Sequence, residues 1–150
     1  MKKVIAVLMV LIACVGIAFA GEIAREGRFI AYDNGTVLDT KMKLMWADKD
    51  NGSDINWEDA KSYCENYRGG GYTDWRMPTQ DELEGLYDRS IIGNNDFHLT
   101  TMITLTASCS WATETRRSAA AYFHFGNGSR HLTDPSNNIN GRVLPVRSFK

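Results

Sequence analysis

An acidic stretch, DKDNGSDINWED, is the first part of the chain with the side chains of a metal site. It places Asp48, Asp50 and Asp54 around Gly52, and carboxylates are the oxygen ligands that calcium prefers. A calcium loop of the EF-hand type needs glycine at its sixth position and glutamate at its twelfth. Counted from Asp48, Gly52 stands fifth and Asp59 stands twelfth. The stretch departs from that template, and acids beside a helix N-terminus, where the helix dipole favours them, explain the same residues.

Two histidines, His124 and His131, could form a second metal site. Asn127-Gly128 favours a two-residue hairpin turn, because both residues tolerate a positive φ. Such a turn would put His124 directly opposite His131, with Cβ atoms about 5 Å apart. Two imidazoles at that separation can chelate a metal, and His98 is the one histidine left as a third ligand. An exposed polar hairpin face is the simpler interpretation, so we expect no metal or other cofactor.

Cys64 and Cys109 are the cysteines that follow residue 20. In an oxidising compartment an even pair most simply forms one disulfide. The closed loop of about 45 residues would be worth on the order of 3–4 kcal/mol. The alternative is two free thiols in a copper or redox site. The chain contains no nucleophile elbow, HExxH pair or phosphate loop, so we expect a protein that is not an enzyme.

The stretch GGGYTDWRMPTQDEL sets Trp75 beside Arg76. In a binding site, Trp75 would stack on a sugar or base and Arg76 would hold an anion. In a scaffold, Trp75 would be buried between helices and sheet, and Arg76 would bridge nearby acids. Three acids are within reach in the sequence: Asp74, Asp81 and Glu82. The glycines before and Pro78 after fix the path of the segment, which favours the scaffold interpretation.

The first twenty residues, MKKVIAVLMVLIACVGIAFA, have the basic start, short apolar run and small-residue end of a signal peptide. We expect cleavage after Ala20 and an exported domain, periplasmic or secreted, over residues 21–150. A competing interpretation takes LIAC as a lipobox, which would anchor the protein in a membrane through lipidated Cys14. The polar turn expected after a lipobox is missing, and contact with a membrane is expected only through that lipid.

The composition points to one domain without nucleic acid as a partner. Without Lys2 and Lys3, 15 of the 17 basic side chains remain against 18 acidic ones, a net charge of −3. No basic stripe is available to neutralise phosphates. No repeat or Pro/Ser-rich linker divides residues 21–150, a length that suits a single core.

Two helices, between two groups of strands, are expected to position these residues. Asn56 can cap the first helix, which carries an apolar stripe through Cys64 and is stopped by three glycines, Gly69 to Gly71. The second helix begins with a capping box formed by Thr79 and Glu82. Short apolar runs predict the following strands: 28–32, 36–39, 43–47, 110–114, 119–125, 129–133 and 142–148.

Irregular chain is expected from 90 to 107, where no period is visible. Pro145 lacks an N–H, so its strand should be an edge strand or carry a bulge. Strands, then two helices, then strands indicate an α+β domain.

Several blocks of the sequence together carry a family resemblance: DNGTVLDTKMKLMW, WEDAKSYCENY, GGYTDWRMPTQDEL, WATE and RVLPVR, in that order. With them the chain resembles the family typified by the C-terminal domain of the Legionella collagen-like protein, a bacterial domain of unknown function. That resemblance implies a C-type-lectin-like fold, distantly related to the formylglycine-generating enzyme. It implies two helices packed on a twisted antiparallel sheet with an irregular long-loop region. The residues that identify the motif are Trp46, Trp57, Trp75, Arg76 and Pro78.

The same resemblance implies an exported binding module. Some family members occur in adhesins and bind sulfated glycans, while most have no assigned ligand. The EPN-like and WND-like motifs of calcium-dependent lectins are absent, and WATE is the nearest counterpart. The usual lectin disulfide joins the first helix to the last strand. Cys64 fits the helix end, and since the last strand has no cysteine, the resemblance leaves Cys109 as its partner.

The ligand is expected on the polar segment between residues 91 and 140, because its amide, carboxylate and guanidinium groups suit hydroxyls. The candidate residues are Asn94, Asn95, Asp96, Asn127, Arg130, Asp134, Asn137 and Asn138. The expected partner is an extracellular glycan or an envelope protein. Two alternatives remain: a protein-interaction or structural subunit of the cell envelope, and an enzyme like the formylglycine-generating enzyme that uses reduced cysteines.

Overall fold

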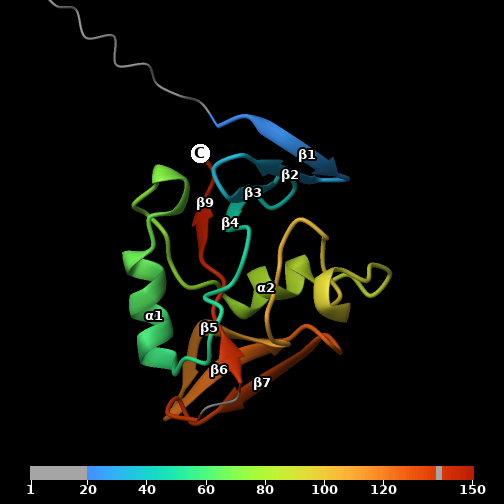
Figure 1. Ribbon diagram of the computed structural model, residues 1–150. Coiled ribbons are helices and arrows are strands. Elements are labelled where there is room, and N and C mark those ends of the chain that lie inside the picture. The colour runs from blue at the N-terminus through green and yellow to red at the C-terminus, as the bar shows by residue number, and fades with distance from the viewer. Residues whose placement is uncertain (1–19, 138–139) are drawn as a thin grey trace, which may run out of the picture.

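A computed structural model describes residues 20–137 and 140–150, which form an α+β domain with two sheets and two α-helices (Figure 1). The expected signal peptide before Ala20, Cys14 with it, and Asn138 lie outside the described residues. The strands are β1 (Glu22–Glu26), β2 (Phe29–Tyr32), β3 (Thr36–Asp39), β4 (Leu44–Ala47), β5 (Cys109–Arg116), β6 (Ala119–His124), β7 (Ser129–Thr133), β8 (Gly141–Arg142) and β9 (Val146–Ser148). The helices are α1 (Trp57–Asn66) and α2 (Gln80–Leu86), with short 3-10 turns η1 (Gly69–Gly71) and η2 (Asn94–Asp96).

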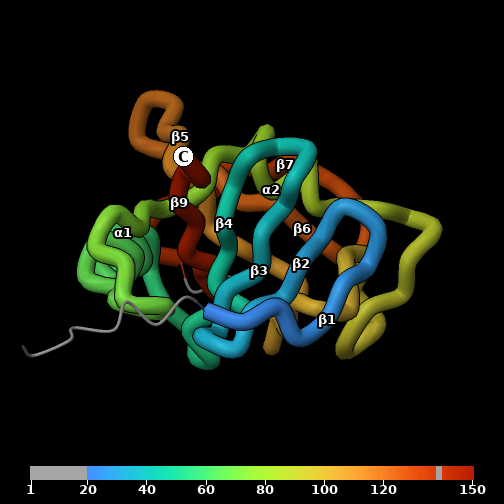
Figure 2. Tube along the Cα trace, turned by 90° about the horizontal axis from the view of Figure 1, so that it is seen from above, coloured from blue at the N-terminus to red at the C-terminus, as the bar shows by residue number. Residues whose placement is uncertain are grey.

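The two sheets lie at opposite ends of the domain, with α2 between them and α1 on one flank (Figure 1). The first sheet is antiparallel, in the order β1-β2-β3-β4-β9, and its strands run side by side when seen from above (Figure 2). The second is curled, in the order β7-β6-β5-β8, with β8 parallel to β5. Among the described helices none is long and apolar enough to cross a membrane.

Two apolar clusters hold these layers together. The larger cluster joins both sheets to α2 through fully buried side chains such as Trp46, Leu83 and Phe123. The smaller cluster packs α1 against the second sheet, with Cys64 against Trp111. Leu99, Ile103 and Leu105 of the irregular segment are also buried in the larger cluster, which explains how a chain without regular structure is held there.

Both predicted helix starts are confirmed. Asn56 accepts from the Asp59 N–H at 2.9 Å, and Thr79 and Glu82 form the reciprocal capping box. The prediction that glycines stop α1 is wrong. The helix ends at Asn66, where Tyr67 turns to extended backbone and its N–H bonds to the Cys64 carbonyl. The glycines form η1 after that turn, with Gly70 and Gly71 at positive φ.

The first six predicted strands are present with ends within two residues of the prediction, and β1 is a further strand that was not predicted. Four of the five residues of β1 are exposed, so the strand lacks the apolar alternation that marks a half-buried strand. Pro145 divides the predicted last strand into β8 and β9, each at the edge of a different sheet. This is the edge position that its missing N–H requires.

The hairpin of β6 and β7 corrects the predicted histidine pair. His124 pairs with Ser129, and His131 pairs with Tyr122. The connection therefore has four residues, and Asn127-Gly128 is only its second half. His131 stacks on the Tyr122 ring, with centroids 4.9 Å apart, and the two imidazole centroids are 6.5 Å apart. The shift of two residues removes the direct opposition on which chelation depended.

The segment around Trp75 is a scaffold corner, as predicted. Trp75 is buried, and its indole N–H donates to the Gly69 carbonyl at 3.1 Å. Arg76 makes two hydrogen bonds to Glu82, of 2.8 and 2.6 Å, and exchanges two backbone bonds with Val146. The carbonyl of Pro78 accepts from Thr113 of β5 at 2.8 Å. The corner thus ties α2 to both sheets. The other two candidate acids serve elsewhere: Asp74 bonds to Arg147 and Asp81 to Arg130.

Candidate ligand-binding site

An open pocket of about 220 Å³ lies where the start of α1 meets the hairpin of β5 and β6. Its lining combines an aromatic ring, charges of both signs and hydroxyls. The lining residues are Trp57, Glu58, Thr115, Arg117, Ser118, Ala119 and Pro135. An apolar surface with a few polar groups around it is the usual composition of a small-molecule site.

Trp57 is half-buried and fixed at both its backbone and its ring. The indole N–H donates to the Ala112 carbonyl of β5 at 2.8 Å, and the backbone N–H donates to the Pro135 carbonyl at 3.1 Å. The Lys61 ammonium lies 5.9 Å from the ring centroid, one helical turn further along α1. The ring is therefore a rigid wall with a cation beside it.

Arg117 supplies the other cation. It is exposed in the turn between β5 and β6, with φ +56°. A non-glycine residue in the left-handed region costs about 1–2 kcal/mol. Within the described part of the chain Arg117 makes no ion pair within 4 Å. The two-residue turn between Arg116 and Ala119 requires this positive φ, and it leaves the unpaired guanidinium exposed at the pocket.

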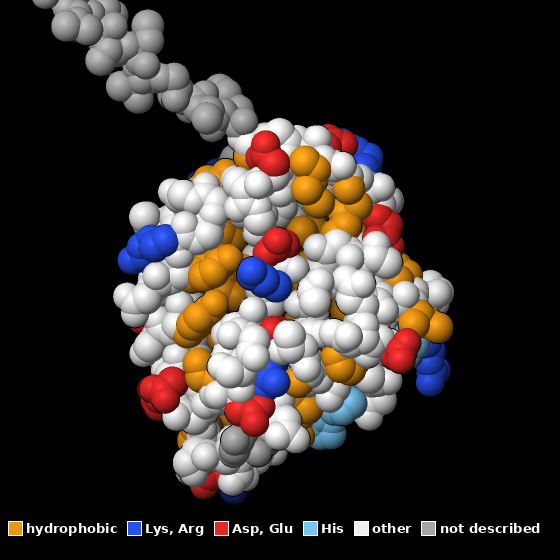
Figure 3. Space-filling model, in the orientation of Figure 1, with side chains coloured by type: hydrophobic (Ala, Val, Ile, Leu, Met, Phe, Trp, Pro, Cys, Tyr) orange, Lys and Arg blue, Asp and Glu red, His pale blue; other side chains and the backbone are white. Residues whose placement is uncertain are grey.

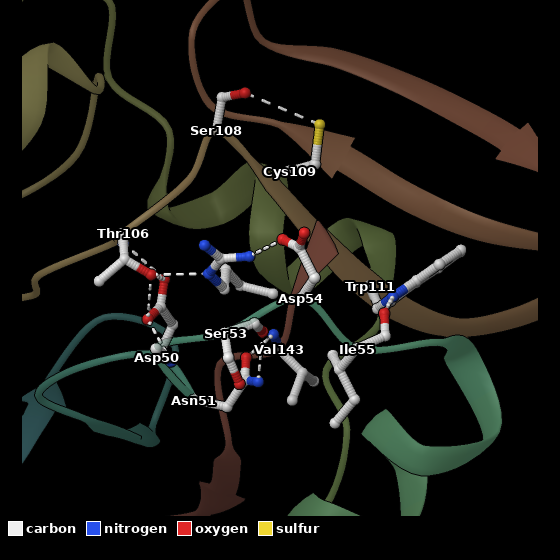
Figure 4. A network of polar contacts seen from close by, with 12 residues as sticks. Asp50, Asn51, Ser53, Asp54, Ile55, Thr106, Ser108, Cys109, Trp111 and Val143 are labelled. Atoms are coloured by element: carbon white, nitrogen blue, oxygen red, sulfur yellow. Dashed lines mark hydrogen bonds and ion pairs between the residues drawn. The ribbon is translucent and has the colours of Figure 1, made fainter. Parts of the chain in front are cut away.

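The loop before α1 is held by a polar network (Figure 4). The Asp50 carboxylate is buried and accepts from the Thr106 N–H at 2.6 Å, the Thr106 hydroxyl at 2.9 Å and the Gly52 N–H at 2.9 Å. Arg142 donates to the Thr106 hydroxyl at 2.7 Å and pairs with Asp54. This network joins the loop to β8 and so fixes the start of α1, including Trp57.

The predicted calcium candidates belong to this loop but do not share an ion site. Asp50 is bonded by protein donors, and Asp54 is neutralised by Arg142. Asp48 lies beside Gly35 of the turn between β2 and β3. Among the described residues, no three side chains of His, Cys, Asp or Glu are grouped to hold a metal ion.

Cys64 and Cys109 are both free, so the predicted disulfide between them is not formed. Cys64 packs from α1 into the smaller apolar cluster, whereas Cys109 begins β5 with its Sγ 3.7 Å from the Ser108 hydroxyl. Each sulfur thus has a different set of neighbours. Burial raises the pKa of the Cys64 thiol well above its ordinary value. Burial also raises the pKa of Cys109, against the smaller opposing effect of Ser108. Neither thiol is activated as a nucleophile.

A serine–histidine contact next to Cys109 has the spacing of a catalytic pair. Ser108 Oγ lies 3.2 Å from His124 Nε2. The Gly126 N–H donates to His124 Nδ1 at 3.1 Å, so the proton of the neutral ring sits on Nε2. That nitrogen donates to Ser108 and has no lone pair to accept its proton. The contact therefore lacks the general base that a serine nucleophile needs.

The predicted ligand residues are distributed over three places rather than one. Asn94, Asn95 and Asp96 form η2, where the two asparagine amides donate to carbonyls of the same irregular segment, those of Thr101 and Leu105. Asn127 caps the hairpin turn by accepting from Ser129. These side chains complete local turns.

The remaining candidates lie along β7 and beyond it. Arg130 pairs with Asp81 and Glu84 on α2. Asp134 accepts from Ser136, and Asn137 donates to Thr133. Asp134 and Asn137 flank Pro135 of the pocket, whereas Asn127 lies at the other end of β7, about 20 Å away along the strand. Of the predicted ligand residues, only Asp134 and Asn137 lie close to the pocket, through their neighbour Pro135.

None of the pocket residues was predicted to bind a ligand, and three of them, Thr115, Arg117 and Ser118, stand together in the sequence. They stand in the short TRRS turn between two strand-like runs, where no motif marks them. Positive and negative side chains are interspersed on the face shown in Figure 3.

Residues 35–147 match the family described as the Lcl C-terminal domain. Among proteins with curated descriptions, none matches the chain.

Proposed function

Because the chain belongs to the Lcl C-terminal domain family, we propose that it is an exported, non-enzymatic module that binds an extracellular glycan at the Trp57 pocket. The observation that carries the proposal is the pairing of a fixed, half-buried Trp57 with an unpaired Arg117 across one open pocket. A sugar ring offers an apolar face of C–H groups, which an aromatic ring can cover, and a hydroxyl edge, which polar side chains can bond.

The roles follow from position. Trp57 covers the apolar face of a sugar ring. Arg117 donates to ring substituents or to an acidic group. Thr115 and Ser118 offer hydroxyls as donors and acceptors, and Glu58 accepts. We further infer a C-type-lectin-like arrangement of the domain, supported by the order of strands, two helices, irregular segment and strands, and by the family.

The experiment is a glycan array probed with the exported protein, with and without calcium. The Trp57→Ala change should weaken binding of any positive glycan about tenfold or more, since each tenfold step is about 1.4 kcal/mol. Arg117→Ala should weaken it severalfold. Arg116→Ala is the matched control, because Arg116 precedes Arg117 in the same hairpin and does not line the pocket. Equal loss in Arg116→Ala and Arg117→Ala would indicate non-specific charge attraction instead.

A second candidate function, binding of a protein, is favoured by another cleft. It also has a volume of about 220 Å³ and lies between the turn of β1 and β2 and the end of α2. Phe29, Tyr87 and Ile91 line it, and Ile92 beside it is 67% exposed. Exposed apolar side chains next to a cleft suit a protein partner. If no glycan binds, and Ile92→Ser rather than Trp57→Ala abolishes attachment to envelope proteins, the second function holds.

A further inference from the structure

Gly21, the second of the described residues, is fixed to the turn between β2 and β3. Its backbone N–H donates to Asp33 Oδ1 at 2.9 Å, and its carbonyl accepts from the Asp33 N–H at 2.9 Å. The nitrogen of Gly21 thus points directly at a carboxylate. Two reciprocal bonds at the start of the domain set the path by which the chain enters β1.

Glycine is the residue that permits this approach. A Cβ built at position 21 would lie 3.2 Å from Asp33 Oδ2, which is tighter than ordinary side-chain contacts. A larger residue would press the carboxylate away from the nitrogen. The close approach therefore depends on the residue type that follows Ala20.

Asp33 has no cationic partner among the described residues. Seven ion pairs are formed within them, and none includes Asp33. The neighbouring acid, Glu22, is paired with Arg25 at 2.9 Å. Asp33 is thus an exposed carboxylate whose side chain accepts from a single backbone amide, that of Gly21.

We propose that Asp33 is the receptor for the α-ammonium group that forms at Gly21 when the Ala20–Gly21 peptide bond is hydrolysed. Water is consumed, Ala20 leaves with the new carboxylate, and the Gly21 nitrogen takes up protons to become –NH₃⁺. In the uncut chain the same nitrogen is a neutral amide donor. Cleavage converts a neutral hydrogen bond into a charge-assisted ion pair, which is the stronger of the two.

This site couples maturation of the chain to the stability of its first strand. β1 is the outermost strand of its sheet, and four of its five residues are exposed. An ion pair at Gly21, immediately before the strand, holds the strand end that would otherwise fray. The processed protein is therefore more stable than a chain that carries even one extra residue. The inference is independent of what the Trp57 pocket binds.

The test has two parts. The first is the intact mass of the protein exported from the full-length chain, which should correspond to residues 21–150. The second is a four-member cycle: the processed protein beginning at Gly21 and the same protein beginning at Ala20, each with Asp33 and with Asp33→Asn. Urea unfolding at pH 6.5 gives the equilibrium constant of each member.

We expect the extra Ala20 to raise the unfolding constant about threefold to fivefold when Asp33 is present, as for a well-placed exposed ion pair. It should have no effect in the Asp33→Asn protein. Glu22→Gln, an acid paired within β1, is the control and should leave the effect of Ala20 intact. An exported mass that begins elsewhere would overturn the proposal. So would an effect of Ala20 that is the same with and without the Asp33 carboxylate.

Discussion

Replacing Glu82 with alanine should be one of the costliest surface changes in this domain. The Glu82 side chain is 15% exposed and makes two hydrogen bonds to Arg76, of 2.8 and 2.6 Å. It also accepts from the Thr79 N–H at 2.9 Å, which completes the capping box of α2. Charged hydrogen bonds contribute about 1.5–3 kcal/mol and a cap about 1 kcal/mol. Arg76 is 40% exposed, so solvent screening reduces the first term, and we expect a loss of about 2–3 kcal/mol.

Asp81 provides the matched control. It is the neighbouring acid in the same first turn and also pairs with an arginine, Arg130 at 2.7 Å, but it is 80% exposed. Asp81→Ala removes the same favourable interaction with the helix dipole, so the comparison isolates burial and capping. It should cost under about 1 kcal/mol. Urea unfolding followed by tryptophan fluorescence measures both. Equal costs for the two variants would refute the structural role assigned to this corner.

Three further predictions concern pH, the thiols and the hairpin. Burial raises the pKa of Glu82, but the bonds from Arg76 and Thr79 outweigh it, so the net shift is downward. Its contribution to stability is present above the unfolded pKa and is lost as pH falls through the lower folded value. The difference in stability between wild type and Glu82→Gln should therefore start to shrink as pH falls below about 4.3 and vanish only below the folded pKa. Cys64 and Cys109 should not react with a thiol reagent in the folded protein, and both should react once the protein is denatured, with no reductant added. If both sulfurs stay unreactive in the denatured protein, they form a disulfide. Arg117→Gly should leave stability unchanged or raise it by up to about 1 kcal/mol, because glycine relieves the left-handed strain but gains unfolded-state entropy, while a clear loss would contradict the strain argument.

Local chemistry made much of this fold predictable. Asn56, Thr79 and Glu82 mark helix starts by hydrogen bonds between near neighbours, and these starts are confirmed. Pro145 restricts its segment to the edges of the sheets because it has no backbone N–H to donate to a neighbouring strand. The register of the hairpin was not predictable in this way. Asn127-Gly128 is compatible with turns of two or four residues, and a shift of two keeps every side chain on its face, so buried Phe123 and Phe125 fit both registers.

The candidate site was predictable only in part, because local sequence does not determine which turn a hairpin adopts or which residues meet across it. Trp57 was predicted only as a residue of the structural motif and not as a ligand-binding residue. Arg117 was not predicted as a ligand-binding residue, because its exposure at the pocket depends on which turn the β5–β6 hairpin adopts and on the absence of a nearby acid. The pairing of Cys64 with Cys109 followed from their number and from the resemblance, whereas the packing of α1 places Cys64 among apolar side chains instead.

The most direct test of glycan binding at Trp57 is to follow the indole N–H signals of the four tryptophans by NMR during titration with a glycan identified on the array. Trp46, Trp75 and Trp111 are buried, between 0% and 3% exposed, and Trp57→Phe assigns the remaining signal. We predict that the Trp57 signal shifts in proportion to occupancy while the other three stay in place. Saturable glycan binding that leaves the Trp57 signal unchanged would contradict the proposed site.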